Sequence, residues 1–402
     1  MCNTIKKKTA HVLASILAVV LAAITFGGSV WTGPSWCCLF SWLFVQDSHY
    51  DNVDTTPINP DASPQARALL AYLGSIYGEY TLSGQYINEY ESFHSPTYQV
   101  DPNDPNSPYT VFKINELQAV YGVTGKHPAL LGLDISGTEC GNPCYSVEQA
   151  IEWHKAGGIV TICWHWLVDN FDGKPRAFYT DQTDFDLAAA LADKNSAQYK
   201  GLIADIDKVS ESLKVLQQAG VPVLWRPLHE ASGGWFWWGA SGIRAYKELW
   251  DLLYDRMTNY HGLNNLIWVY NGQSPFWYVG DSKCDIIGDD PYYPDNSRFA
   301  YLLDPANRWK FWVNYLTSRK KMIAMTENDF VPNIKNAYAR NARWLTFCTW
   351  CREFVCEMDG ISTTPNYGSP YTTAKELKAA YDNQHVLTLD ETAAAGIYSS
   401  AH

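Results

Sequence analysis

The sequence predicts an α/β fold, and specifically a single (β/α)8 TIM barrel. Its 402 residues exceed what one small domain needs and suit one large barrel preceded by a leader. Short runs rich in β-branched and aromatic residues alternate with longer helical stretches, which is the pattern of βαβ units and a parallel sheet. Eight such runs match the number of strands that closes a barrel.

The predicted elements follow from this alternation. The clearest helix precedes the fourth strand, because its apolar residues recur at three- and four-residue steps: Ile203, Ile206, Val209, Leu213 and Leu216. Gly220 and Pro222 end that helix, and Ile243–Tyr260 is the next one. The strands are expected at Thr81–Tyr86, Ala129–Ile135, Gly158–Trp164, Val223–His229, Leu266–Asn271, Asp285–Asp289, Met322–Thr326 and Trp344–Trp350.

The first residues have the pattern of a targeting segment. Three lysines at positions 6–8 precede an apolar run from His11 to Phe26 and then small residues. We therefore predict a secretory signal at residues 1–29, or a membrane anchor if it stays uncleaved. Residues 30–56 are predicted as the rest of the leader and a linker, and the stretch from about Ser48 to Asp61 has the polar composition of a linker. Residues 57–402 are predicted as the barrel domain, with Ser95–Pro108 as a long surface loop.

Composition excludes one class of partner and favours another. The net charge of -12 argues against nucleic-acid binding, which needs a basic face. Most of the 17 tryptophans and 26 tyrosines are expected to pack in the core. An excess of this size also fits sugar binding, because aromatic rings stack on the apolar C–H faces of pyranose rings.

Seven cysteines follow the leader region, so at least one is expected to lack a disulfide partner. Cys140 and Cys144 flank a Gly-Asn-Pro turn, where a small-loop disulfide is plausible. Cys348, Cys351 and Cys356 lack a second CxxC or a matching histidine cluster. The sequence therefore predicts no metal site.

Polar and aromatic residues follow the predicted strands at the end where barrel enzymes carry their active sites. A single glutamate there is more often part of a surface ion pair. Two glutamates that directly follow apolar strands, among histidines and aromatic residues, favour a catalytic pair, Glu230 and Glu327. Their neighbours at other strand ends are His165, His229, Tyr292 and Trp350.

Two carboxylates that face a glycosidic bond can perform its hydrolysis. One gives its proton to the leaving oxygen and the other attacks the anomeric carbon, and a separation of about 5–5.5 Å retains the configuration. His229 precedes one of these acids, where a role in orienting the site is expected. The sequence HEASG lacks the second histidine of HExxH, which argues against a zinc peptidase.

The segment WRPLHEASGGWFWWG, residues 225–239, closely resembles the signature of glycoside hydrolase family 26, the endo-β-mannanase family. The likeness runs in order from about Pro57 to past Trp350. Its other segments are PALLGLDI at 128–135, GGIVTICWHW at 157–166, DIIGDDPYY at 285–293 and the Thr326-Glu327 turn.

The resemblance implies a (β/α)8 fold and a retaining double displacement. It implies Glu230 as the acid/base, Glu327 as the nucleophile and Tyr292 as a hydrogen-bond donor to the nucleophile. His165 and His229 match histidines of the family pattern, and Trp235 and Trp350 match sugar-stacking residues. Two further tryptophans of the signature, Trp237 and Trp238, fit either packing or the platform, and Trp225 is expected in the core.

The implied function is a secreted, extracellular endo-β-1,4-mannanase that hydrolyses mannan, glucomannan and galactomannan. Its expected partners are β-mannan polysaccharide and manno-oligosaccharides, and we expect a monomer with no cofactor and no protein partner. One alternative is the same machinery acting on mixed-linkage β-glucan or β-1,3-xylan. Another is a non-catalytic sugar-binding barrel, against which the presence of both glutamates speaks.

Three positions depart from the family pattern. Ala231-Ser232 stands where Met-Asn is frequent, and Asn328-Asp329 replaces a glycine-containing turn. Cys351-Arg352 follows Trp350, which leaves open the residue that supplies an arginine some relatives use there. These changes bear on subsite preference more than on the chemistry.

Overall fold

The computed structural model describes residues 49–88, 110–142, 145–293, 308–309, 311–313, 320–356 and 367–399. The predicted signal or anchor at 1–29, the predicted loop Ser95–Pro108 and Cys144 lie outside these ranges. In the part that is described, no helix combines the length and the hydropathy needed to cross a bilayer.

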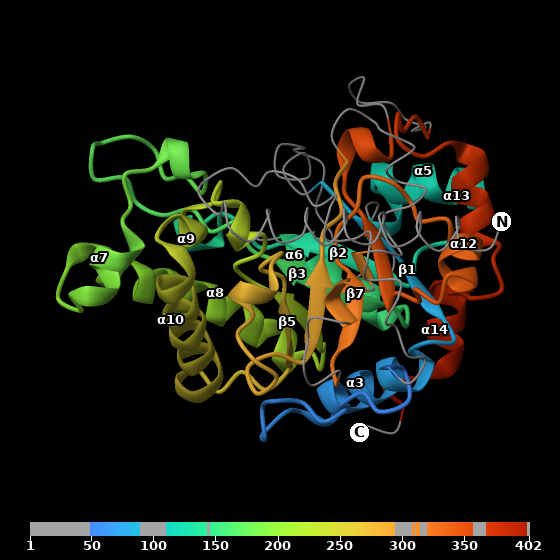
Figure 1. Cartoon of the computed structure of the whole chain (residues 1–402), viewed down its shortest axis with the longest axis horizontal. Coiled ribbons are helices and arrows are strands. Elements are labelled where there is room, and N and C mark those ends of the chain that lie inside the picture. Colours follow the sequence, from blue (N-terminus) through green and yellow to red (C-terminus); the bar gives the residue numbers. More distant parts are fainter. Residues whose placement is uncertain are drawn as a thin grey trace, which may run out of the picture. The chain divides into compact units, whose positions relative to one another are not determined.

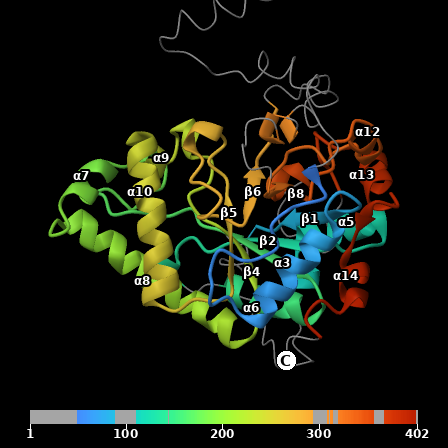
Figure 2. The ribbon, with the colours of Figure 1, turned by 60° about the horizontal axis from the view of Figure 1, so that its bottom comes forward.

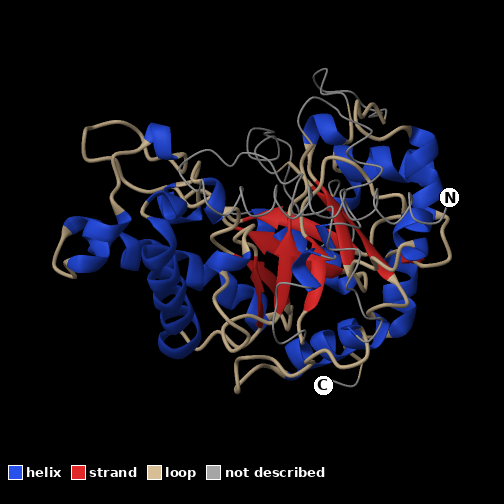
Figure 3. Cartoon of the chain, in the orientation of Figure 1, coloured by secondary structure: helices blue, strands red, loops and turns tan. Residues whose placement is uncertain are grey.

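Eight parallel strands form the centre of the barrel (Figures 1 and 3), in the order β7-β6-β5-β4-β3-β2-β1-β8. Hydrogen bonds from Leu345 N–H to the Ile323 carbonyl (2.9 Å) and from Trp350 N–H to the Asn328 carbonyl (3.0 Å) join the two ends of that order. The strands are β1 Thr81–Tyr86, β2 Leu130–Asp134, β3 Ile159–Cys163, β4 Val223–Arg226, β5 Leu266–Tyr270, β6 Ile286–Asp289, β7 Met322–Met325, β8 Thr346–Thr349 and a short β9 Val386–Leu387 that pairs with β1.

All eight predicted barrel strands are confirmed. The fourth differs most from its prediction, at its C-terminal end. Val223–His229 was the expected span, but β4 stops at Arg226. Leu228 and Glu230 both have φ of 53°, in the left-handed region that a strand does not contain. The chain therefore turns sharply just before the candidate acid.

Helices surround the strands (Figures 2 and 3). The predicted helix before β4 is confirmed as α8; Ser196 caps its start by accepting a hydrogen bond from Tyr199 N–H, and Gly220, at φ 72°, follows its end. The helix predicted at Ile243–Tyr260 consists of α10 and a π-helical turn at Asp255–Tyr260. The α-helices are α3 Pro64–Ile76, α5 Asn115–Thr124, α6 Tyr145–Lys155, α7 Leu187–Ala192, α8 Ala197–Gln218, α9 Trp237–Ala240, α10 Gly242–Tyr254, α12 Ile334–Ala339, α13 Ala374–Tyr381 and α14 Leu389–Ala395.

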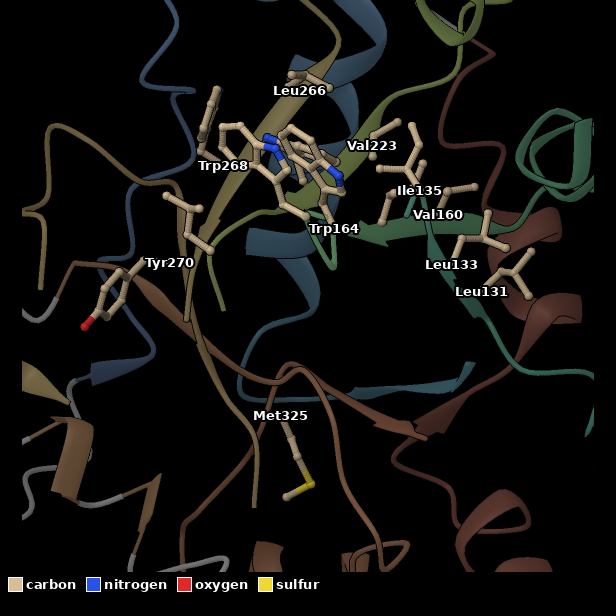
Figure 4. Close-up of a cluster of buried hydrophobic side chains, with 14 of the residues drawn as sticks. Leu131, Leu133, Ile135, Val160, Trp164, Val223, Leu266, Trp268, Tyr270 and Met325 are labelled. Carbon is tan, nitrogen blue, oxygen red and sulfur yellow. The ribbon is translucent and has the colours of Figure 1, made fainter. Parts of the chain in front are cut away.

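Side chains on each strand alternate between the barrel interior and the helix layer. In β2, Leu130 belongs to the interior cluster, whereas Leu131 and Leu133 pack under the helices. Figure 4 shows that outer layer, in which Trp164 and Trp268 lie among aliphatic side chains of β2 to β5. The interior is apolar toward the N-terminal ends of the strands and becomes polar at their C-terminal ends. The candidate site therefore lies at the C-terminal end of the barrel.

The segment predicted as a linker is described from His49 onward, and it lies against the barrel. Asp54 N–H donates to the Lys320 carbonyl at 2.7 Å. Ile58 N–H donates to Asp285 Oδ1 at 2.7 Å, and Asp285 is buried. These contacts tie the N-terminal side of the barrel domain to the starts of β6 and β7.

Candidate active site

Glu230 lies in a tight turn directly after β4. Its backbone adopts φ 53° and ψ 24°, a conformation uncommon for any residue other than glycine. Asn271, at the end of β5, holds the turn, because Glu230 N–H donates to the Asn271 carbonyl at 2.6 Å and lies 3.2 Å from Asn271 Oδ1. Such conformations persist where the surroundings fix them, and they cluster at functional sites.

Glu327 follows β7, and both of its carboxylate oxygens accept hydrogen bonds. Arg226 donates to Oε1 through Nη2, and the Tyr292 hydroxyl donates to Oε2 at 2.7 Å. Arg226 is fully buried and also donates to Asp290 Oδ2 at 3.0 Å and to the Tyr86 hydroxyl at 3.1 Å. A carboxylate with an arginine and a tyrosine as donors is held in one orientation, in an arrangement suited to an anion.

Asp290 is a third carboxylate beneath the pair. Its Oδ1 accepts hydrogen bonds from Asn271 Nδ2 at 3.0 Å and from the Thr326 hydroxyl at 2.6 Å. Gly288 makes this packing possible, because a Cβ there would lie 2.6 Å from Thr326 Oγ1. Burial, opposed by Arg226 and reinforced by the charge of Glu327, raises the pKa of Asp290 to about 7.

The two glutamates lie close together, and the surroundings of Glu230 act on its protonation. One ligand oxygen from each of Glu230, Asp290 and Glu327 lies within 4.8 Å of the others. Burial, and then the charges of Asp290 and Glu327, raise the pKa of Glu230 well above its usual range. The raised pKa favours the protonated form of Glu230, which a general acid requires.

His165 and His229 form a hydrogen-bonded chain with Asp134. His165 Nδ1 lies 2.6 Å from Asp134 Oδ2, and its Nε2 lies 3.2 Å from His229 Nε2. Burial lowers the His165 pKa, but Asp134 more than offsets this and the net pKa is raised. Burial, Arg226 and His165 hold the His229 pKa well below its usual range. We infer from this network that His165 donates and a neutral His229 accepts.

The aromatic residues of the signature fall into two groups. Trp235 is 48% exposed, and its indole N–H donates to Glu230 Oε2 at 3.0 Å. Trp237 and Trp238 are buried, and their N–H groups donate to the carbonyls of Trp166 and His229, each at 2.7 Å. Of the two interpretations of these tryptophans, packing beneath the turn is therefore correct. Trp225 is also buried, as predicted.

A cleft of about 640 Å³ opens beside this centre. His165 and Trp350 form one part of its lining, and the Trp350 ring lies 4.7 Å from the Tyr86 ring, centroid to centroid. The volume falls in the range of sites that enclose small organic ligands. Arg352 also lines the cleft, and its Nη2 lies 3.3 Å from Asn88 Oδ1.

The structure thus brings together the seven residues predicted for the site and adds four that the sequence analysis missed: Asp134, Arg226, Asn271 and Asp290. Each of the four is at or just past the end of a strand, in the phase that points into the barrel. This inward position was a usable signal, because a buried charge or amide that points into the barrel needs a partner from another strand.

The turn after Glu327 is built without glycine. Asn328 Oδ1 accepts a hydrogen bond from Cys348 N–H at 2.9 Å, and its Nδ2 donates to the Phe330 carbonyl at 2.9 Å. Asp329 accepts from Tyr293 N–H and from Phe330 N–H, each at 2.7 Å. Asn328 and Asp329, which depart from the family pattern, therefore fix the end of β7 through hydrogen bonds of their own side chains.

Comparison with known proteins places this site in a family. The family model for glycosyl hydrolase family 26 matches residues 58–391. A mannan endo-1,4-beta-mannosidase of Thermothelomyces thermophilus is 40% identical over 83% of this chain and 62% of its own length. Mannan endo-1,4-beta-mannosidase A of Piromyces sp is 33% identical over 84% of this chain and 51% of its own. The chain therefore spans about half to three-fifths of these relatives.

Solved structures agree with the family match. A Podospora anserina GH26-CBM35 beta-(1,4)-mannanase superposes with a TM-score of 0.68 at 37% identity, over 85% of this chain and 69% of that one. A beta-mannanase from a symbiotic protist of the termite Reticulitermes speratus, complexed with gluco-manno-oligosaccharide, gives 0.67 at 28% identity, over 85% and 98%. With the family model matched along most of the chain and the fold shared, this protein belongs to glycosyl hydrolase family 26.

Proposed function

We propose that this chain is an endo-acting β-1,4-mannanase that cleaves mannan, glucomannan and galactomannan with retention of configuration. The observation that carries the proposal is the pair Glu230 and Glu327, one protonated by its surroundings and one held by Arg226 and Tyr292, beside an open cleft. The relatives named above support the substrate class, because they act on mannan by name.

The spacing of the pair favours retention. Oxygens of Glu230 and Glu327 lie within 4.8 Å of each other. Retaining enzymes hold their two carboxyl groups about 5–5.5 Å apart, whereas inverting enzymes need about 6.5–9.5 Å to admit a water molecule between acid and base. A pair as close as this leaves room for the sugar carbon but not for an interposed water.

In the first step, a carboxylate oxygen of Glu327 attacks the anomeric carbon and the bond to the leaving oxygen breaks. Glu230 transfers its proton to that oxygen, so a shortened chain departs with a new hydroxyl and a mannosyl ester of Glu327 remains. Tyr292 fixes the attacking carboxylate in line through the 2.7 Å hydrogen bond to its other oxygen.

In the second step, water replaces the departed chain. Glu230, now ionised, accepts a proton from that water while the water oxygen attacks the anomeric carbon and the ester bond breaks. Glu230 regains its proton and Glu327 its charge, so the site returns to its starting state. No metal or organic cofactor is required in either step.

Binding is assigned to residues on both sides of the pair. Trp235 presents an exposed ring whose indole N–H already contacts Glu230, and Trp350 and His165 line the cleft. We assign stacking on sugar rings to the two tryptophans and contact with the substrate to the ring of His165, whose nitrogens face Asp134 and His229. His229 acts indirectly, because it is buried and supports His165.

The proposal extends to location and assembly. The pattern of residues 1–29 supports export to the extracellular space, and a monomer is the expected state. Determining the N-terminal residue of the protein recovered from the medium, and its molar mass by light scattering, tests both. A protein retained in the membrane fraction, or a mass of twice the chain, would revise this part alone.

The test is product analysis with linear mannan, glucomannan, barley β-glucan and β-1,3-xylan as separate substrates. We expect short manno-oligosaccharides from mannan and a rapid fall in polymer length, as an endo-acting enzyme gives. Products from β-glucan or xylan alone would keep the catalytic pair and overturn the substrate. No hydrolysis, combined with retained binding to mannan, would favour the sugar-binding barrel.

A further inference from the structure

We propose that Asp134, Cys163 and His165 form a binding site for a thiophilic divalent cation such as Zn²⁺ or Cd²⁺, and that an ion bound there inhibits the enzyme. Ligand atoms of the three side chains lie within 4.8 Å of one another. The three residues come from the ends of two neighbouring strands, β2 and β3. Nothing in the proposed hydrolysis uses the thiol.

The donor set selects the class of ion. Zinc is bound by thiolate sulfur, imidazole nitrogen and carboxylate oxygen, and thiolate ligands favour zinc and softer ions over magnesium and calcium. An ionised Asp134 and a thiolate at Cys163 carry two negative charges, which match a divalent ion when His165 is neutral. The guanidinium of Arg226 interacts electrostatically with Cys163.

The site is closed at one end and open at the other. Cys163 is fully buried at the inner end, in the apolar cluster of the barrel interior. The side chains of His165 and Asp134 are 14% and 24% exposed, and both line the cleft. An ion can therefore enter from the cleft, and three protein ligands leave a fourth position for water.

Hydrogen bonds around the site already orient two of the ligands. Asp134 Oδ1 accepts from the backbone N–H groups of Ser136 (3.0 Å) and His165 (3.2 Å), which leaves Oδ2 facing the ring. His165 Nε2 faces His229, so Nδ1 is the nitrogen that turns toward Asp134. Outer-shell bonds of this kind fix the orientation of metal-binding histidines.

The ion would replace a proton. His165 Nδ1 and Asp134 Oδ2 are 2.6 Å apart, whereas two ligands about 2.0–2.2 Å from a tetrahedral zinc stand about 3.3 Å from each other. The pair must open by less than about 1 Å. Binding releases the Nδ1 proton of His165 and the thiol proton of Cys163, so metal affinity falls as the pH is lowered.

A second group of acidic side chains, Glu230, Asp290 and Glu327, has the same spacing but a different character. Its ligands are all carboxylates, and Arg226 already donates to Asp290 and Glu327. Arg226 therefore already supplies a positive charge to that group. This difference predicts that Zn²⁺ and Cd²⁺ bind the chain whereas Mg²⁺ and Ca²⁺ do not compete with them.

Inhibition follows from the place of His165 and rests on the proposed function. Metal binding opens the pair of His165 and Asp134, which shifts the His165 ring, and the water on the ion faces the cleft assigned to the sugar. Substrate and metal should therefore exclude each other, and added manno-oligosaccharide should weaken zinc binding. The binding itself requires no activity, so it can be measured even if the substrate assignment is wrong.

The experiment is calorimetric titration of the full chain with ZnCl₂ and CdCl₂, followed by X-ray absorption of the zinc-loaded protein. We expect one bound ion with one sulfur at about 2.3 Å in its shell. Cys163→Ser should weaken binding at least about tenfold and remove the sulfur signal. Asp134→Asn, a change at a partly exposed position, should also weaken binding.

Two controls make the result decisive. Cys140→Ser removes an exposed thiol, and Cys284→Ser removes another buried one; both should leave zinc affinity unchanged. Thermal unfolding of each variant shows whether it is folded. A zinc shell without sulfur, loss of binding with Cys140→Ser, or full affinity in folded Cys163→Ser would overturn the proposal.

Discussion

Glu230 and Glu327 are the same residue type at equivalent places in the barrel, yet their surroundings are opposite. Glu327 accepts hydrogen bonds on both oxygens, from Arg226 and Tyr292. Glu230 accepts one from the indole of Trp235 and faces the charges of Asp290 and Glu327. The Glu327 carboxyl is thus contacted by hydrogen-bond donors, whereas the Glu230 carboxyl is buried beside other acidic groups.

The difference teaches how a symmetric pair of residues acquires two roles. Donors stabilise a carboxylate, whereas burial and neighbouring negative charge favour the protonated acid. Pairs of titratable groups whose surroundings push their pKa values apart identify the acid and the base. Arg226 is the residue that creates the asymmetry, because it binds Glu327 and Asp290 but donates no hydrogen bond to Glu230 within the described part of the chain.

The largest expected effect comes from removing the nucleophile. Glu327→Ala should lower kcat on mannan at least about 10³-fold, because no covalent intermediate can form. Azide should partly restore cleavage and give an α-mannosyl azide, since it attacks in one inverting step from the vacated side. Glu353→Ala, which removes a carboxylate elsewhere in the cleft lining, is the matched control and should have little effect. A β-configured azide product would contradict the assignment.

Removing the acid should lower the rate by an amount that depends on the leaving group of the substrate. Glu230→Gln should lower kcat on mannan about 10²–10⁴-fold, because the leaving oxygen is no longer protonated. A dinitrophenyl mannoside needs no such proton, so formation of the intermediate from it should be largely spared. Comparing burst kinetics on the two substrates checks this. An equal loss on both would mean that Glu230 is not the acid.

Tyr292→Phe tests the hydrogen bond that orients Glu327. Loss of a bond to a charged group costs about 1.5–3 kcal/mol, so kcat should fall about 10–100-fold with a smaller change in KM. Tyr293→Phe is the control, because its ring packs on Phe330 away from the pair. Steady-state kinetics on mannopentaose separate the two constants. An unchanged kcat would show that Arg226 alone holds the nucleophile.

Asp290→Asn tests the electrostatic origin of the Glu230 proton. Removing this charge should lower the Glu230 pKa, so the alkaline limb of kcat/KM, which reports loss of the acid's proton, should move to lower pH. Asparagine keeps the shape and an acceptor oxygen for Arg226. A general loss of rate without movement of the limb would assign Asp290 a structural role only.

Trp235→Phe should have the smallest effect of these variants, and it should shift the Glu230 pKa in the opposite direction from Asp290→Asn. The indole N–H lowers the Glu230 pKa and is the weakest of its causes, so removal of this donor should move the alkaline limb slightly to higher pH, while the remaining ring still stacks. The pH profiles of this variant and of Asp290→Asn should be measured together. If the alkaline limbs of the two variants moved in the same direction, the electrostatic explanation would be refuted.

The sequence predicts the barrel and both glutamates because apolar strands that end in polar residues leave a repeated pattern. It does not predict Arg226 and Asp290 as partners, because their pairing depends on the closure that brings β4, β6 and β7 together. It also places the end of β4 too late, since nothing in Leu228 or Glu230 signals a positive φ. The role of Trp237 and Trp238 depends on burial, which a local run of aromatic residues does not reveal.

The most direct test of the two-role account is to trap the covalent intermediate. A manno-oligosaccharide with fluorine at C2 of the reacting sugar and a good leaving group at C1 should form the ester and hydrolyse slowly, because fluorine destabilises the oxocarbenium-like transition states. Digestion and mass spectrometry then locate the label. The account predicts the label on Glu327 of the AMTEND segment. A label on Glu230, or turnover with no labelled carboxylate, would contradict it.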